Sequence, residues 1–319
     1  MFRQVPGLAG VFSITASENL TNCVSHGNRA GCSRCAGRSY AELIAEVNTA
    51  ISEGVLAGNP EARVLVWDWG WDDSQAREII RRLPKSCWLM SVSEWALPIE
   101  RGGVASAVGE YSLSAVGPGP RAMAHWRYAK EAGLKTVAKV QVNASWEMAV
   151  VPALPMPVRG LGPRHAGNLA AASTDGVMLS WSLGGYPSAN LELFQSHGDG
   201  DSEAALRQLA EKYYGKRAAP EVRRAWKAFS DAFEQFPYHG LTLYSGPQHM
   251  GPANPPISSR RVIGPAWWEF PTMRWTIGAR CILPRHLSGR WRKWPKDSHA
   301  DARRCVRPLR SRRGKSDSP

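Results

Sequence analysis

The chain has 319 residues, of which 43% are hydrophobic and 21% are charged, and its formal net charge is +13. This apolar content excludes a wholly disordered or collagen-like chain, and the length suits one large domain or two ordinary ones. No apolar run reaches the ~18 residues of a membrane-spanning helix, and six cysteines are too sparse for a disulfide scaffold.

Strand and helix patterns alternate along the chain. Short apolar runs predict strands, and apolar residues at helical spacing, such as Leu43, Val47 and Ile51, predict helices. The predicted order is strand 10–15, helix 40–53, strand 63–67, helix 73–83, strand 87–92, helix 121–132, strand 136–142, helix 165–172, strand 176–181 and helices 203–213 and 221–236. Asp72 or Asp73 is expected to cap the second helix.

Strands that alternate with helices at this spacing indicate parallel βαβ units. A doubly wound sheet and a (β/α)8 barrel both satisfy the pattern, but no glycine-rich phosphate-binding loop follows the first strand. We therefore expect an α/β fold that is a partial (β/α)8 barrel. Five strands are visible where a barrel has eight, so we expect that upstream strands are absent or that the start codon is internal.

Acidic, amide and indole side chains follow most of the predicted strands, where a barrel places its active site. These residues are Glu18 and Asn19; Asp68, Trp69 and Trp71; Glu94 and Trp95; Asn143, Trp146 and Glu147; and Trp181. A single tryptophan is more often a core residue than a ligand. Tryptophans beside carboxylates at several strand ends nevertheless indicate a sugar site, because the ring packs on the sugar and the carboxylates do acid–base work.

Six segments together resemble bacterial glycoside-hydrolase-like (β/α)8 proteins that are distantly related to family 20 β-N-acetylhexosaminidases. They are 10–19 (GVFSITASEN), 64–71 (VLVWDWGW), 88–95 (WLMSVSEW), 111–119 (YSLSAVGPG), 139–147 (KVQVNASWE) and 176–186 (GVMLSWSLGGY). The resemblance covers roughly residues 5–256. It implies that the first strand here is about the fourth of a barrel, that the last is the eighth, and that the chain is N-terminally truncated with an aberrant C-terminus.

The resemblance also implies site roles. Glu18 matches the general acid of family 20, whereas Ser17 stands where that family has the aspartate that orients the substrate's acetamido group. Glu94 is a candidate second carboxylate, as base or nucleophile, or else a hydrogen-bond partner of a neighbouring loop or arginine. Trp181 resembles the wall of the sugar subsite. The implied function is hydrolysis of O-glycosidic bonds, with sugars that contain N-acetylhexosamine as expected substrates, or sugar binding by an inactive relative.

Four residues of metal-ligand type lie within 13 positions after the first strand: Cys23, His26, Cys32 and Cys35. The C-x-x-H and C-x-x-C pairs have the spacing with which two side chains hold one tetrahedral ion, and thiolates with an imidazole suit Zn²⁺. We expect a structural zinc and no catalytic cofactor. A disulfide of Cys35 with Cys32 or Cys23, or free thiols, are the alternatives.

Other histidines, His125, His165, His197 and His239, are isolated in the sequence, and we expect them on the surface or in loops. No G-x-S-x-G motif is present to support a serine hydrolase.

The net charge belongs to the C-terminal part of the chain. Residues 257–319 hold 16 Lys and Arg against four acidic residues, a net charge of +12, whereas residues 1–256 hold 24 against 23. The segment is rich in Arg and Trp and has no persistent period. A nucleic-acid-binding appendix and an ordinary surface extension both fit, and a frame-shifted translation of a GC-rich gene is favoured.

The expected organisation is the C-terminal part of a barrel over residues 1–200, a helical extension over 201–256 and a basic tail over 257–319. We expect a carbohydrate partner, no membrane and no nucleic acid as the main ligand. Because no signal peptide is visible, a cytoplasmic location is expected.

Overall fold

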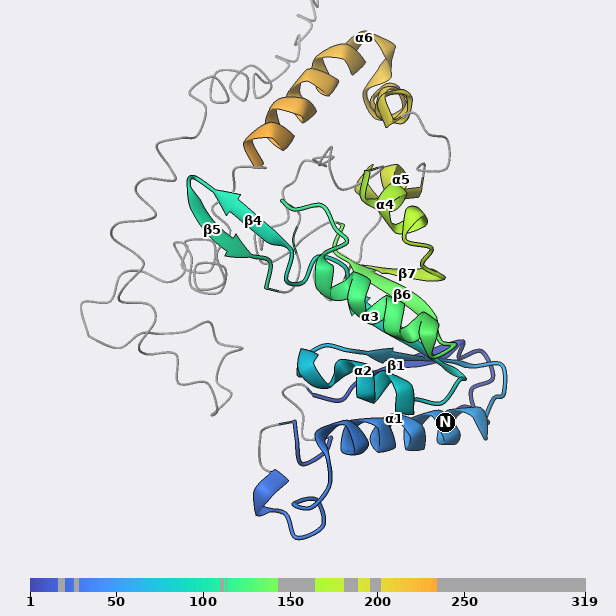
Figure 1. Ribbon diagram of the computed structural model, residues 1–319. Coiled ribbons are helices and arrows are strands. Elements are labelled where there is room, and N and C mark those ends of the chain that lie inside the picture. Colours follow the sequence, from blue (N-terminus) through green and yellow to red (C-terminus); the bar gives the residue numbers. More distant parts are fainter. Residues whose placement is uncertain are drawn as a thin grey trace, which may run out of the picture.

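A computed structural model gives the architecture of the protein (Figure 1). The structure describes residues 1–16, 21–25, 29–109, 112, 114–142, 164–180, 189–195 and 202–233. None of the helices in these ranges combines the length and the hydropathy needed to cross a membrane.

A curled, fully parallel sheet forms the centre of the fold. Its strands are β1 (Gly10–Ile14), β2 (Arg63–Trp67), β3 (Cys87–Val92), β6 (Lys135–Val140) and β7 (Gly176–Leu179), in this spatial order. The order of the strands in the sheet follows their order along the chain and never reverses. A doubly wound sheet requires such a reversal, whereas an unreversed order with right-handed crossovers keeps the helices on one face. The winding is therefore that of a half-barrel.

Helices α1 (Tyr40–Leu56), α2 (Asp73–Arg82) and α3 (Pro120–Glu131) lie along one side of this sheet (Figure 1). The Ser39 hydroxyl accepts a hydrogen bond from the Glu42 amide at the start of α1, and the Asp72 carboxylate accepts one from the Ser74 amide at the start of α2. These caps satisfy amide groups that have no partner within the helix. The prediction that Asp72 or Asp73 caps the second helix is confirmed for Asp72.

The main core lies between the helices and the sheet. Fully buried Ile44, Ile79 and Ile80 of α1 and α2 pack in one cluster with Val64 and other strand residues. Burial of each such side chain stabilises the fold by about 1.5–3 kcal/mol. A smaller cluster occupies the opposite face of the sheet, which we call the inner face. It comprises Trp67, Met90, Val92 and Val137, with partly buried residues around them.

Two parts of the fold were not predicted. Strands β4 (Pro98–Arg101) and β5 (Val104–Ala107) form a hairpin whose turn, Gly102-Gly103, has positive φ at both residues. Helix α5 (Ala189–Gln195) was also missed.

Helix α4 (His165–Ala171) and the long α6 (Ser202–Phe233) complete the helices, with a short 3-10 turn, η1 (Arg29–Gly31). The sequence predicted two helices where α6 lies. The chain breaks helical geometry at Gly215 (φ 77°, ψ 157°), and Pro220 lies within the second part.

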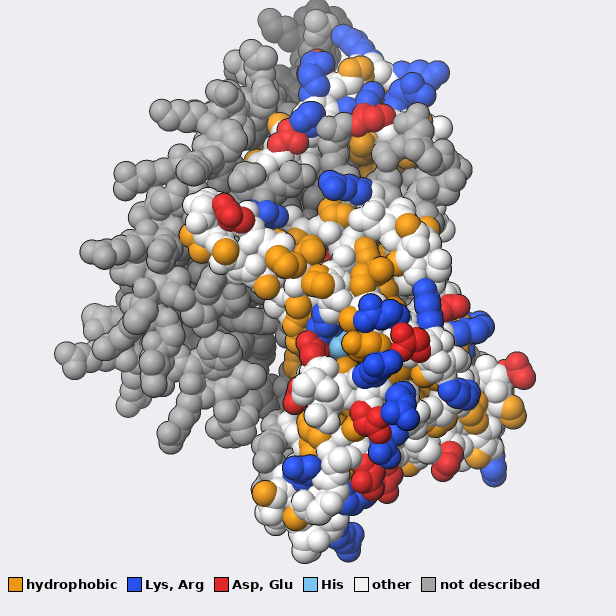
Figure 2. Space-filling view, in the orientation of Figure 1, with side chains coloured by type: hydrophobic (Ala, Val, Ile, Leu, Met, Phe, Trp, Pro, Cys, Tyr) orange, Lys and Arg blue, Asp and Glu red, His pale blue; other side chains and the backbone are white. Residues whose placement is uncertain are grey.

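Acidic and basic side chains are interspersed over the region of α1 to α3 (Figure 2), as the near-neutral charge of residues 1–256 leads one to expect. The predicted tail, 257–319, lies outside the described residues. The expected α/β class and the half-barrel sheet are found, whereas the assignment of the strands to barrel positions four to eight remains a prediction.

Candidate functional site

The inner face of the sheet carries a polar group at the carboxyl end of its central strand. Glu94 follows β3 and continues the alternation of Met90 and Val92, which belong to the inner-face cluster. Its side chain is fully buried. In a (β/α)8 fold this end of the strands is where reactions are catalysed. Glu94 is therefore the described carboxylate that is best placed for chemistry.

Lys139 comes from the neighbouring strand and interacts electrostatically with Glu94. Lys139 belongs to β6 and lies in register with Val92 of β3. It follows Val137 of the inner-face cluster by two residues, so its side chain is on the inner face as well. Burial lowers the pKa of the Lys139 ammonium group to about 8, and the negative charge of Glu94 opposes this shift. At neutral pH the site thus combines a carboxylate with a protonated, buried amine, a pairing that favours the ionised carboxylate.

His165, the first residue of α4, contacts the same strand end. Its Nδ1 lies 3.4 Å from Oε1 of Glu94, and its Nε2 is hydrogen-bonded to the Ser93 hydroxyl at 2.7 Å. All three side chains are fully buried. Burial lowers the pKa of His165 to about 4, so the ring is neutral at pH 7. The neutral ring thus shares a hydrogen bond with Ser93 through Nε2 and turns its Nδ1 side to Glu94.

The order Ser93, His165, Glu94 is that of nucleophile, base and acid in serine hydrolases. The hydroxyl of Ser93, however, is closed off by the chain at Gly117. A Cβ atom on Gly117 would lie 2.6 Å from the Ser93 oxygen and 3.0 Å from His165 Nε2. This packing leaves no room for a substrate carbonyl at the hydroxyl. The arrangement therefore positions Glu94 instead of presenting Ser93 for attack.

Two of the predicted tryptophans lie on the inner face of the sheet. Trp69 and Trp95 both pack against the inner-face cluster, and their ring centroids are 6.1 Å apart. Both are half-buried. The guanidinium of Arg121 lies over the Trp95 ring, 4.4 Å from its centroid, and fixes the ring from the helix side. The structure thus places the Trp69 and Trp95 rings together on the face of the sheet to which Glu94 belongs, and their role in substrate binding stays a prediction.

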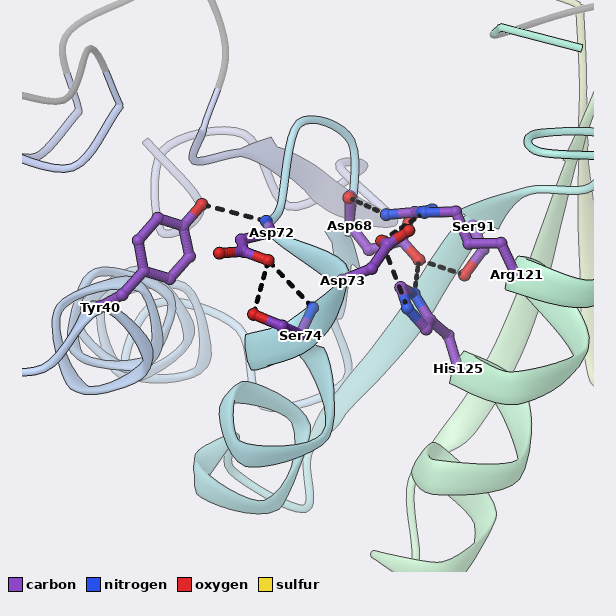
Figure 3. Close-up of polar contacts among 8 residues, drawn as sticks. All are labelled: Tyr40, Asp68, Asp72, Asp73, Ser74, Ser91, Arg121 and His125. Atoms are coloured by element: carbon purple, nitrogen blue, oxygen red, sulfur yellow. Dashed lines mark hydrogen bonds and ion pairs between the residues drawn. The ribbon is translucent and has the colours of Figure 1, made fainter. Parts of the chain in front are cut away.

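Asp68 lies on the other face of the sheet, in a buried polar cluster (Figure 3). Its carboxylate is 2.7 Å from His125 Nδ1, 2.6 Å from the Ser91 hydroxyl and 3.2 Å from Arg121 Nη1. Arg121 also pairs with Asp73 at 2.7 Å. Burial would raise the pKa of Asp68, but the Arg121 charge and the hydrogen bonds from His125 and Ser91 outweigh it and hold the pKa below its usual value.

These contacts give Asp68 a structural task. Arg121 and His125 both belong to α3, so the cluster joins this helix to the ends of β2 and β3. Trp71 is also directed away from Glu94, because it is buried in the core on the helix side and its Nε1 points to the Thr15 hydroxyl at 3.5 Å. The structure does not bring either residue to Glu94, and their predicted contact with substrate has no support from this placement.

Several predicted site residues lie outside the described residues: Glu18, Asn19, His26, Asn143, Trp146 and Trp181. Their roles stay predictions.

Three cysteines of the predicted metal site converge after β1. The sulfur atoms of Cys23, Cys32 and Cys35 all lie within 4.8 Å of one another, and none of the three forms a disulfide. Hydrogen bonds that the Cys23 thiol donates to Cys32 and Cys35 raise its pKa to about 11. The backbone amide of Arg34, together with Cys23 and Cys35, lowers the pKa of Cys32 to about 7.

The expectation that His125 and His165 are surface or loop residues is wrong. Both are at most 2% exposed and lie in the two polar clusters described above. His197 and His239 are outside the described residues. Sequence reasoning also missed Lys139 and Arg121. The position of Lys139 on the buried face of a strand was a usable signal, because a buried lysine normally has an acidic partner nearby.

No family model and no curated protein matches this sequence. Among solved structures, a mutant O-GlcNAc hydrolase of Thermobaculum terrenum is similar, with 12% sequence identity and a TM-score of 0.47. The match covers 74% of this chain and 48% of that protein, so the chain spans about half of its length. The likeness is a loose one to a glycoside hydrolase.

Proposed function

We propose that this protein is a glycosidase-like hydrolase in which Glu94 supplies a catalytic carboxylate. The observation that carries the proposal is the placement of Glu94: a fully buried carboxylate at the carboxyl end of a central parallel strand, close to a buried lysine. Half-buried tryptophans pack on the cluster of the same face of the sheet. Oxocarbenium-like transition states are stabilised by such carboxylates, and glycosidases use two of them.

The role of Glu94 follows from its neighbours. The positive charge of Lys139 stabilises the ionised carboxylate, and a base or a nucleophile must be ionised. Neutral His165 lies against the same carboxylate, with its Nδ1 3.4 Å from Oε1. Glu94 is therefore proposed as the base or nucleophile, and the resemblance to family 20 leaves the role of general acid to Glu18.

The tryptophans supply the sugar-binding surface in this proposal. Trp69 and Trp95 lie together on the inner face of the sheet, and their rings suit the apolar face of a pyranose. N-acetylhexosamine-containing sugars are the proposed substrates, on the resemblance to family 20. Because Ser17 replaces the aspartate that orients the acetamido group there, an ordinary two-carboxylate reaction is proposed in place of participation by the substrate.

The experiment is turnover of a panel of 4-nitrophenyl glycosides, including the N-acetylglucosaminide, by the purified full-length chain. We expect the wild-type chain to release nitrophenol from at least one panel member, and Glu18→Gln and Glu94→Gln to release none. Calorimetric binding of N-acetylglucosamine without turnover of any panel member would instead support an inactive carbohydrate-binding relative. The absence of both sugar binding and turnover would contradict the proposal.

Partners and location are proposed on the same basis. We propose a carbohydrate as the ligand and a cytoplasmic location. Nucleic-acid binding is the alternative for residues 257–319, and a salt-dependent affinity for DNA that is lost on deletion of this segment would support it.

A further inference from the structure

We propose that Cys23, Cys32 and Cys35 bind one Zn²⁺ ion, which fastens the segment between β1 and α1. This metal site is independent of Glu94, so that loss of either assignment leaves the other intact.

The distances between the sulfur atoms fit one tetrahedral ion. All three sulfur atoms lie within 4.8 Å of one another. Zinc–sulfur bonds of ~2.3 Å in a tetrahedron place neighbouring sulfurs ~3.8 Å apart, so a contraction of at most about 1 Å brings the thiolates onto one ion. The three side chains are half-buried and therefore within reach of an ion from solvent.

The backbone around the cysteines already forms the tight turns that a thiolate site needs. The amides of Cys35 and Ala36 both donate to the Cys32 carbonyl, at 3.1 and 2.9 Å, and the Cys32 amide donates to the Arg29 carbonyl at 3.1 Å. Cys32 and Cys35 thus lie on one turn, which presents two sulfurs to the same point. The ion would therefore meet a largely formed pair of ligands.

Cys23 comes from a separate turn that is fixed to the end of β1. The side chains of Thr21, Asn22 and Ser25 all donate to the Thr15 carbonyl, at 2.9, 2.6 and 3.1 Å. An ion held by Cys23 and by the Cys32–Cys35 turn therefore connects the end of the strand to the residues that lead into α1.

The second anchor of the segment is at α1. The Arg38 guanidinium pairs with Glu42 and Glu46 on the first turns of this helix, and the Arg29 guanidinium donates to the Arg38 carbonyl at 2.6 Å. The ion would thus join two turns that are each tied to a different element. Because loop closure by a metal reduces the freedom of the unfolded chain, such a cross-link stabilises the fold.

Zinc is the ion that this ligand set selects. Three thiolates disfavour Mg²⁺ and Ca²⁺, which take oxygen ligands, and tetrahedral sulfur-rich sites are typical of zinc. The fourth position is left to water or to a further side chain.

The first test uses the intact wild-type chain. We expect about one zinc per chain by inductively coupled plasma mass spectrometry after purification under reducing conditions. Cobalt added to the chelator-stripped protein should give the sulfur-to-cobalt charge-transfer band and the visible bands of a tetrahedral site, and zinc should abolish both. Absence of zinc together with absence of the cobalt spectrum would overturn the proposal.

The second test uses substitutions. Cys23→Ser, Cys32→Ser and Cys35→Ser should each weaken zinc binding at least tenfold. Cys87→Ala is the matched control, because this thiol is buried under the helices, away from the cluster. Two results would refute the site. One is undiminished zinc in the triple serine variant. The other is a disulfide between two of the three cysteines in the wild-type chain, seen by mass spectrometry as a cross-linked peptide that is lighter by two hydrogens.

A third measurement remains informative if a variant does not fold. Iodoacetamide should modify Cys23, Cys32 and Cys35 of the wild-type chain after chelation and should spare them in the presence of zinc. Equal modification in both states would count against the proposal.

Discussion

A neutral, buried histidine makes the stability of this protein depend on pH. The pKa of His165 is lowered from 6.5 to about 4 by burial, so the unfolded chain binds a proton between these values and the folded chain does not. Stability is therefore full above pH 6.5 and is lost as the pH falls towards 4. The shift corresponds to about 3 kcal/mol in the free energy of unfolding.

His165→Gln tests this dependence. Glutamine retains a donor and an acceptor but does not titrate, so the variant should lose about 3 kcal/mol less than wild type between pH 7 and pH 4. Urea unfolding at both pH values measures the difference. Parallel losses in the two proteins would show that His165 is not the group responsible.

Lys139 makes the opposite kind of contribution, to activity at alkaline pH. Its pKa of about 8 means that it loses its charge above this pH, and the stabilisation of ionised Glu94 is then lost. If the proposed function holds, kcat/KM falls above pH 8. In Lys139→Arg, the guanidinium stays protonated and the alkaline limb should move upwards by at least one pH unit. An alkaline limb at the same pH in both proteins would contradict the role of Lys139.

At the scale of elements, the Asp68 cluster fastens α3 to the sheet. Asp68 is fully buried and the Arg121 side chain is 3% exposed, so removing one charge leaves the other uncompensated. Asp68→Asn should lower the free energy of unfolding by about 3 kcal/mol. Asp68→Asn with Arg121→Met should recover part of this loss. Chemical unfolding of both variants measures the effect, and a loss below about 1 kcal/mol in the single variant would contradict the assignment.

Local signals predicted most of the elements around this cluster. The Asp72 cap and the apolar residues Ile79 and Ile80 predicted α2, because helix ends and helix faces are written in neighbouring residues. The contact between His165 and Glu94 had no such signal, since 71 positions separate them and only the winding of β3, β6 and α4 brings them together. The same reason hid the pairing of Asp68 with Arg121.

At the scale of the whole molecule, all described helices and strands belong to the near-neutral part, residues 1–256, and the basic part, residues 257–319, lies outside the described residues. The half-barrel was predictable because strands and helices alternate in the first 180 residues, and the sheet order follows from the rule of right-handed crossovers. The face to which each strand-end residue points was predictable only in part. Glu94 and Asp68 both follow a strand, yet only Glu94 continues the inner-face alternation.

The measurement that tests the central claim most directly is kcat/KM of the wild-type chain and of Glu94→Gln on the 4-nitrophenyl glycoside that the wild type cleaves best. Glu100→Gln on the exposed β4 strand is the matched control. A loss of at least about 100-fold in Glu94→Gln, with Glu100→Gln unchanged, is predicted. Wild-type turnover by Glu94→Gln would contradict the account.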